Sequence, residues 1–296
     1  MKKISLFLIL LLISKFFYAQ RVHDFFTQSS ANISYVKKQD SIKIRITGSG
    51  FLIFVLEDTT TKLGKIFLIT NKHVLPNSNE SKTITIKVPS KTEKGIESKE
   101  FNIEIYGKNN ALMSFVKLHK NKNVDVAGID ITYFLTKNKL LISAIPSEFL
   151  FRKADYEKHK IGLGDEVFII GYPSSIYDNR TVMPIVRQGI ISSNPYDDFY
   201  FNESLVKKDS TLPNPLNGFL IDGSIFPGSS GSLVLLKTSY EMTNPKKFSF
   251  SRETSYVLGI ISRNITTQTQ SIDLGIAFNA ECIAEIIDEF YLVRNK

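Results

Sequence analysis

The sequence predicts an all-β protein, either a barrel or a sandwich, that ends in one α-helix. Short segments of alternating or continuous apolar residues recur along the chain, and Gly, Pro, Asn and Asp residues separate them. Many short strands with turn signals between them are typical of these two architectures. Helical spacing of apolar residues is clear only at about residues 279–293, so we expect the helix there.

The first nineteen residues predict a secretory signal peptide. Lys2 and Lys3 form a short basic region, residues 4–13 are an almost unbroken apolar run, and Ala19 offers a small residue for cleavage. The run is too short to span a bilayer and Lys15 follows it, although an uncleaved N-terminal anchor remains an alternative. No later segment could cross a membrane. We therefore expect an exported protein, periplasmic or secreted, with no stable membrane insertion.

The strands are expected where β-rich residues alternate or form short runs. The expected segments are residues 41–46, 50–56, 65–70, 83–88, 101–106, 124–132, 166–171, 185–192, 232–236, 256–262 and 272–278.

About 277 residues remain after the signal peptide, enough for one large β domain or two small ones. Residues 143–160, with a proline and then a charged stretch, are the natural boundary between two halves, at 20–150 and 151–296. Residues 196–217 are rich in Asp, Asn, Pro and Lys and predict a long surface loop.

Charge and cysteine content exclude several classes of protein. The net charge is +8, and three signal lysines reduce it to +5 in the mature chain. The lysine-rich segments show no motif that stacks on RNA or reads a groove, so we expect no nucleic acid partner. Cys282 is the single cysteine, so no internal disulfide is possible. Because Cys282 stands in the helical segment, we interpret it as a buried packing residue.

His73 is the one histidine with an informative setting. It follows the apolar run Ile-Phe-Leu-Ile-Thr in the segment Thr-Asn-Lys-His-Val, where a strand ends. A histidine held there by a packed strand can act as a general base near neutral pH. Taken alone, an ordinary histidine at a strand end is the better interpretation.

Asp125 opens a largely apolar strand in Val-Asp-Val-Ala-Gly-Ile-Asp-Ile. A carboxylate there is costly unless it accepts hydrogen bonds, and an imidazole N–H is a suitable donor. Asp130 is the rival, but it stands deeper in the strand, and we expect it to face solvent or a neighbouring lysine.

The segment Ile-Asp-Gly-Ser-Ile-Phe-Pro-Gly-Ser-Ser-Gly-Ser-Leu-Val, residues 221–234, contains serines bracketed by Gly228 and Gly231. Glycines allow a sharp turn that points successive N–H groups at one spot, as an oxyanion hole requires. The alternative is a Gly/Ser turn of a hairpin.

Together, and in the order His, Asp, Ser, these three segments resemble the trypsin-like (chymotrypsin-fold) serine peptidases. Thr-Asn-Lys-His-Val is similar to the motif of the glutamyl endopeptidase branch, and Pro-Gly-Ser-Ser-Gly-Ser is similar to the family's nucleophile motif. Other strands resemble the bacterial HtrA-like enzymes, and we expect no PDZ module of the kind those enzymes carry. The resemblance implies two six-stranded antiparallel β-barrels with a C-terminal α-helix.

The resemblance also implies the chemistry of a serine endopeptidase that forms an acyl-enzyme with protein or peptide substrates. His73, Asp125 and Ser230 would be the catalytic triad, with the backbone N–H groups of Gly228 and Ser230 as the oxyanion hole. Ser262 matches a family serine that borders the triad aspartate. We expect no metal and no organic cofactor, because no two histidines fall at ligand spacing.

The resemblance places a substrate pocket near the nucleophile, and we expect it to accept small or medium uncharged residues. No acid stands at its floor, which an enzyme selecting Lys or Arg would need. Arg263 is the one residue that could produce the opposite preference, because its guanidinium could pair with a Glu or Asp of the substrate. The expected pocket residues are Ser224, Ile225, Ile261, Ser262, Arg263 and Gly275.

Two other classes stay open: a non-catalytic protein-binding module on the same fold, and an envelope β-protein. The sequence leaves the substrate and the oligomeric state undetermined.

Overall fold

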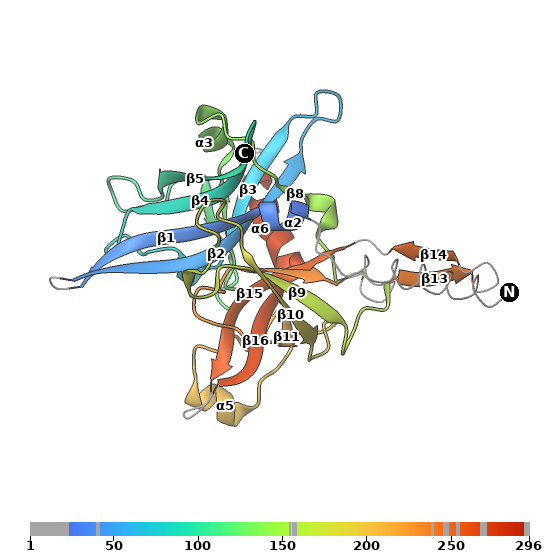
Figure 1. The fold of residues 1–296 in the computed structure, drawn as a ribbon. Coiled ribbons are helices and arrows are strands. Elements are labelled where there is room, and N and C mark those ends of the chain that lie inside the picture. Colours follow the sequence, from blue (N-terminus) through green and yellow to red (C-terminus); the bar gives the residue numbers. More distant parts are fainter. Residues whose placement is uncertain are drawn as a thin grey trace.

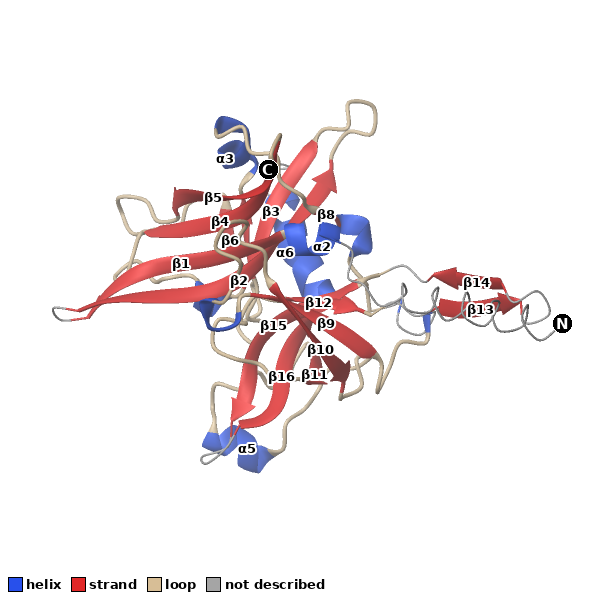
Figure 2. Ribbon diagram, viewed as in Figure 1, coloured by secondary structure: helices blue, strands red, loops and turns tan. Residues whose placement is uncertain are grey.

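The computed structural model describes residues 24–39, 42–153, 155, 159–237, 240–244, 249–252, 255–266 and 271–292. The expected signal peptide, residues 1–19, lies outside these residues. Strands make up most of the regular secondary structure of the described chain, and a helix follows the last of them (Figure 2). The expectation of a mostly β protein with a C-terminal helix is confirmed.

The first half of the chain forms one sheet of eight strands. Its order is β5-β4-β1-β2-β3-β7-β6, and the short β8 pairs with β2. Regular alternation places Ile84 and Ile86 of β4 and Ile103 of β5 in the interior, all fully buried. The strands are β1 (Ser30–Gln39), β2 (Ile42–Leu56), β3 (Gly64–Thr70), β4 (Thr83–Thr92), β5 (Gly95–Glu104), β6 (Val116–Leu118), β7 (Ala127–Asp130) and β8 (Ile145–Pro146).

This first sheet is open, so the expectation of a closed six-stranded barrel here is wrong. Closure would need a ladder between the edge strands β5 and β6, but β6 has only three residues. The chain between them makes a single bridge, from Tyr106 to Leu112, and turns at Asn110 with a φ of 60°. One bridge cannot replace a ladder of paired strands.

The second half closes into a six-stranded antiparallel barrel in the order β10-β11-β16-β15-β12-β9, which confirms the other expected barrel. Its strands are β9 (Glu166–Gly171), β10 (Ile185–Ile191), β11 (Gly218–Asp222), β12 (Leu233–Leu236), β15 (Val257–Thr266) and β16 (Ser271–Asn279). A separate hairpin, β13 (Tyr240–Asn244) with β14 (Ser249–Arg252), connects β12 to β15 (Figure 1).

The C-terminal helix α6 (Ala280–Leu292) packs against both sheets. Gly128 of β7 lets it approach closely, because a Cβ at Gly128 would lie 2.7 Å from Cγ2 of Ile286. Ile286 belongs to one buried apolar cluster with Phe67 of the first sheet and Phe278 of the barrel. This shared core holds the two sheets together and fixes the edges that face the candidate site.

Residues 196–217 are more ordered than the expected surface loop. They contain the helix α5 (Glu203–Lys208), which begins where the Asn202 side chain accepts a hydrogen bond from the Leu205 N–H. Leu212 and Leu216 anchor the segment in the shared core. A helix this short has too few apolar positions to show a periodic pattern.

The remaining helical segments are short. They are α2 (Asp24–Gln28), α3 (Thr132–Lys137) and the 3-10 turns η2 (Lys72–Val74), η3 (Ser147–Phe149) and η4 (Pro173–Ser175). Within the described ranges, no helix combines the length and the apolar character needed to cross a bilayer. The boundary between the two halves at residues 150 and 151 remains a prediction.

Candidate functional site

The candidate site begins with a direct contact between His73 and Asp125, which stand 52 residues apart. His73 lies in η2, immediately after β3, and Asp125 lies two residues before β7, the strand that pairs with β3. The Nδ1 atom of His73 is 2.5 Å from Oδ2 of Asp125, and the His73 backbone N–H donates to Oδ1 at 3.2 Å. The carboxylate therefore fixes both the ring and the backbone of His73.

Asp130, the rival carboxylate, forms an ion pair with Lys65 at 3.3 Å. The expectation that it faces a neighbouring lysine is confirmed.

Ser262 links Asp125 to Ser230. Its hydroxyl donates to Oδ2 of Asp125 at 2.8 Å, and its carbonyl accepts the Ser230 hydroxyl at 2.7 Å. The register of β15 against β16 shifts between Ile261 and Arg263, so Ser262 occupies a β-bulge. A bulge redirects a residue out of the ladder, which leaves both polar groups of Ser262 for the site.

Ser230 differs in exposure from the two neighbouring serines. Ser229 and Ser232 are buried, whereas Ser230 is partly exposed. Gly228 and Gly231 adopt φ angles of 86° and 87°, a region that favours glycine. A Cβ at Gly231 would also lie 1.8 Å from the Ser49 carbonyl oxygen, so the loop requires glycine there.

The backbone of this loop leaves selected N–H groups available. The Ser229 N–H donates to the Phe226 carbonyl and the Gly231 N–H donates to the Ile261 carbonyl. Within the described part of the chain, the N–H groups of Gly228 and Ser230 have no acceptor. These are the two groups expected to form an oxyanion hole, and a substrate oxygen could accept from them.

Ser49 is a site residue that the sequence motifs did not single out. It is fully buried in β2, and its hydroxyl donates to the Gly228 carbonyl at 2.7 Å and accepts the Tyr172 N–H at 2.9 Å. Its N–H donates to the Ser230 carbonyl at 2.7 Å. Ser49 thus holds the Ser230 loop of the barrel against the first sheet. The only signal was its place in Gly-Ser-Gly ahead of an apolar run.

The six expected pocket residues do not line one cavity. Ser262 and Arg263 border a cavity of ≈ 520 Å³ together with His73 and Asp125. Ser224 borders a different cavity of ≈ 460 Å³, beside Asp222 and Asp273. The other three, Ile225, Ile261 and Gly275, are buried. A Cβ at Gly275 would lie 2.6 Å from Cγ1 of Ile225, so this isoleucine occupies the space beside the glycine.

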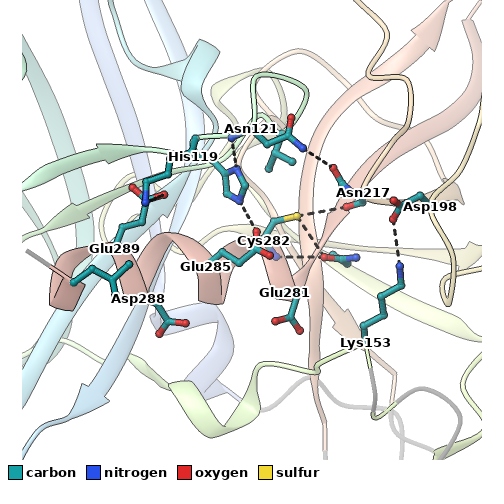
Figure 3. Close-up of a pocket in the computed structure, with 14 residues that line it drawn as sticks. His119, Asn121, Lys153, Asp198, Asn217, Glu281, Cys282, Glu285, Asp288 and Glu289 are labelled. Carbon is teal, nitrogen blue, oxygen red and sulfur yellow. Dashed lines mark hydrogen bonds and ion pairs between the residues drawn. The ribbon is translucent and has the colours of Figure 1, made fainter.

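A third cavity, of ≈ 650 Å³, lies along α6 (Figure 3). His119, Cys282 and Glu285 each place one potential metal-ligand atom there, within 4.8 Å of the others. The His119 Nδ1 accepts the Asn121 N–H at 3.2 Å, so the ring proton resides on Nε2 and is donated to Glu285 at 2.7 Å. Both ring nitrogens are engaged, so these residues do not fit a metal ion.

Cys282 itself is buried, and burial raises the pKa of its thiol, with the nearby Glu285 carboxylate adding to the effect. The expectation of a packing cysteine is confirmed.

Comparisons with known proteins place the fold. Two solved structures are similar: "HtrA-type protease AlgW with decapeptide", at a TM-score of 0.48, and "HtrA-type protease AlgWS227A with decapeptide", at a TM-score of 0.50. Each is 17% identical in sequence and covers 90% of this chain. The chain in turn spans 66% and 65% of their lengths. No protein-family model and no curated protein sequence matches. The protein has the chymotrypsin-like β-barrel fold.

Proposed function

We propose that this protein is a serine endopeptidase that hydrolyses protein or peptide substrates through His73, Asp125 and Ser230. The observation that carries the proposal is the continuous chain of contacts from His73 through Asp125 and Ser262 to Ser230. The likeness to a fold that carries an HtrA-type protease supports it as an analogy.

The proposed mechanism assigns one role to each group. The Ser230 hydroxyl leaves the Ser262 carbonyl, turns to the His73 ring and attacks a peptide carbonyl while His73 Nε2 takes its proton. Asp125 holds the Nδ1 proton of His73 and stabilises the imidazolium. The N–H groups of Gly228 and Ser230 receive the negative charge that develops on the substrate oxygen. His73 then delivers the proton to the leaving amine, and water hydrolyses the acyl-enzyme.

We further propose cleavage after small or medium uncharged residues. We base this preference on the family resemblance, which assigns the uncharged residues Ser224, Ile225 and Ile261 to the pocket, because uncharged walls cannot cheaply desolvate a charge. A library of peptides that varies the residue before the scissile bond measures it. A dominant preference for Lys or Arg would contradict the assignment and direct attention to Asp222 and Asp273.

Export remains part of the proposal. Analysis of the N-terminus of the protein purified from its natural host should find Gln20 first, in the periplasm or the medium. Met1 on the exported protein would instead favour an N-terminal anchor.

The test of the activity is hydrolysis of an unstructured protein such as casein. We expect turnover with the wild-type chain and at least a thousandfold loss with Ser230→Ala, because the triad acts as a unit. Ser229→Ala is the matched control, since Ser229 is adjacent and buried. Retention of activity in Ser230→Ala would contradict the assignment of the nucleophile. Absence of any hydrolysis by the wild-type chain would favour a non-catalytic binding module.

A further inference from the structure

Residues 210–213 line part of the cavity beside His73, and Asp209 immediately precedes them. Thr211, Leu212 and Pro213 line this cavity together with Ser262 and Arg263. Leu212 is buried in the shared core, so the wall is anchored in the fold. A substrate side chain next to the scissile bond could enter this cavity, and it would then meet Arg263.

Arg263 is bound to this wall. One guanidinium nitrogen, Nη2, donates to Oδ2 of Asp209 at 3.0 Å, and another, Nη1, donates to the Thr211 hydroxyl at 2.7 Å. Asp209 in turn accepts the Thr211 N–H at 3.0 Å. The guanidinium is therefore held by two side chains that are themselves hydrogen-bonded to each other.

We propose that Asp209 is a specificity-determining residue, because it occupies the Arg263 guanidinium and so prevents this cation from pairing with an acidic substrate side chain. The inference rests on the proposed peptidase function and names its substrate class. The preferred peptides carry an uncharged residue in the cavity beside His73.

The positive charge around the cavity explains why the Asp209 carboxylate can determine whether an acidic substrate side chain is accepted. Three cationic side chains line it, from Lys72, Lys122 and Arg263, and Asp125 is already engaged by His73 and Ser262. The Lys72 ammonium donates to the Asn121 carbonyl at 2.9 Å. Hydrogen bonds from Thr211 lower the pKa of Asp209, and the neighbouring Arg263 lowers it further. Asp209 is thus ionised at neutral pH and offsets the positive charge of Arg263.

The experiment compares paired peptides that carry Glu or Gln at each of the four positions before the scissile bond. We measure the ratio of kcat/KM for Glu over Gln. Asp209→Asn should raise this ratio about fivefold at one position, which matches the upper range for a partly exposed ion pair. Adding Arg263→Gln to Asp209→Asn should return the ratio to the wild-type value. Glu203→Gln is the matched control, since it removes a charge from α5 and should change nothing.

An unchanged ratio in a folded Asp209→Asn protein overturns the inference while hydrolysis itself stands. Arg263→Gln alone decides the matter if Asp209→Asn does not fold. The inference predicts that Arg263→Gln has a Glu-over-Gln ratio of kcat/KM within twofold of the wild-type ratio, because Asp209 and Thr211 already occupy the guanidinium in the wild-type protein. A fall in the ratio would show that Arg263 binds acidic side chains in the wild-type protein, and would overturn it. Absence of all hydrolysis by the wild-type chain overturns the proposed function and the inference together.

Discussion

Ser49→Ala tests how the two sheets assemble the site. The substitution removes a fully buried hydroxyl that bonds to the Gly228 carbonyl and the Tyr172 N–H, at 2.7 and 2.9 Å. Each lost hydrogen bond costs about 1 kcal/mol, and the two orphaned backbone groups add a desolvation cost of similar size. We expect the free energy of unfolding to fall by about 3 kcal/mol. For a protein of this size that corresponds to a melting temperature about 6–12 °C lower.

Activity should fall more than stability alone explains. The Gly228 carbonyl that Ser49 holds belongs to the peptide next to the expected oxyanion hole. Loss of one oxyanion donor costs about a hundredfold or more in turnover, so a partial loss of order should cost at least about tenfold. Labelling by a fluorophosphonate, followed well below the melting temperature, measures this rate separately from unfolding.

Ser90→Ala is the matched control. Ser90 is also buried, but its hydroxyl makes one longer bond, 3.2 Å, to the carbonyl of Leu141, which is not a site residue. It should lower stability by about 1 kcal/mol and leave the labelling rate unchanged. A melting temperature for Ser49→Ala within about 2 °C of wild type, with labelling within twofold, would show that the Ser49 hydroxyl neither stabilises the fold nor orders the Ser230 loop.

Three further predictions follow from single contacts. Gly231→Ala should lower the free energy of unfolding by more than about 3 kcal/mol, because the new Cβ would clash with a backbone carbonyl and the φ of 87° disfavours alanine. Gly162→Ala is the control and should be neutral, because open space surrounds Gly162. Equal urea midpoints for the two variants would contradict this prediction. Burial and then a nearby carboxylate raise the pKa of Tyr35 to about 12. The stability that the protonated Tyr35 hydroxyl contributes is therefore complete below pH 10 and is lost as the pH rises toward 12. Tyr35→Phe should remove this loss of stability at alkaline pH. If the urea midpoint of the wild-type protein changes between pH 8 and pH 11 by the same amount as that of Tyr35→Phe, the prediction is wrong. Asp125→Asn should fold normally and label about ten-thousandfold more slowly, whereas Asp130→Asn should label at the wild-type rate; similar rates for the two would reject the triad assignment.

His73 and Asp125 each carry a local signal in the sequence, and the family resemblance joins the two into one predicted site. A histidine that ends one buried strand and a carboxylate that opens another can be recognised without knowing how the strands pair. The strand pairing, β3 with β7, then brings them together. Ser262 was expected to border the aspartate only through the family resemblance. Its geometry depends on a bulge in β15, and the sequence has no reliable signal for a register shift.

The parts that could not be predicted depend on tertiary packing. Closure of the first sheet would depend on how β5 meets the three-residue β6, which no period-two pattern can decide. The contact of Arg263 with Asp209 joins a barrel strand to a loop 54 residues away. The sequence alone predicts only a long surface loop at residues 196–217 and an Arg263 guanidinium that could reach a substrate.

Labelling with a fluorophosphonate probe tests whether Ser230 is an activated nucleophile. Peptide mapping by mass spectrometry locates the adduct among Ser229, Ser230 and Ser232. We predict a single adduct on Ser230, formed within minutes and absent from His73→Ala. An unlabelled protein with normal folding, or an adduct on Ser232 in place of Ser230, would contradict the account.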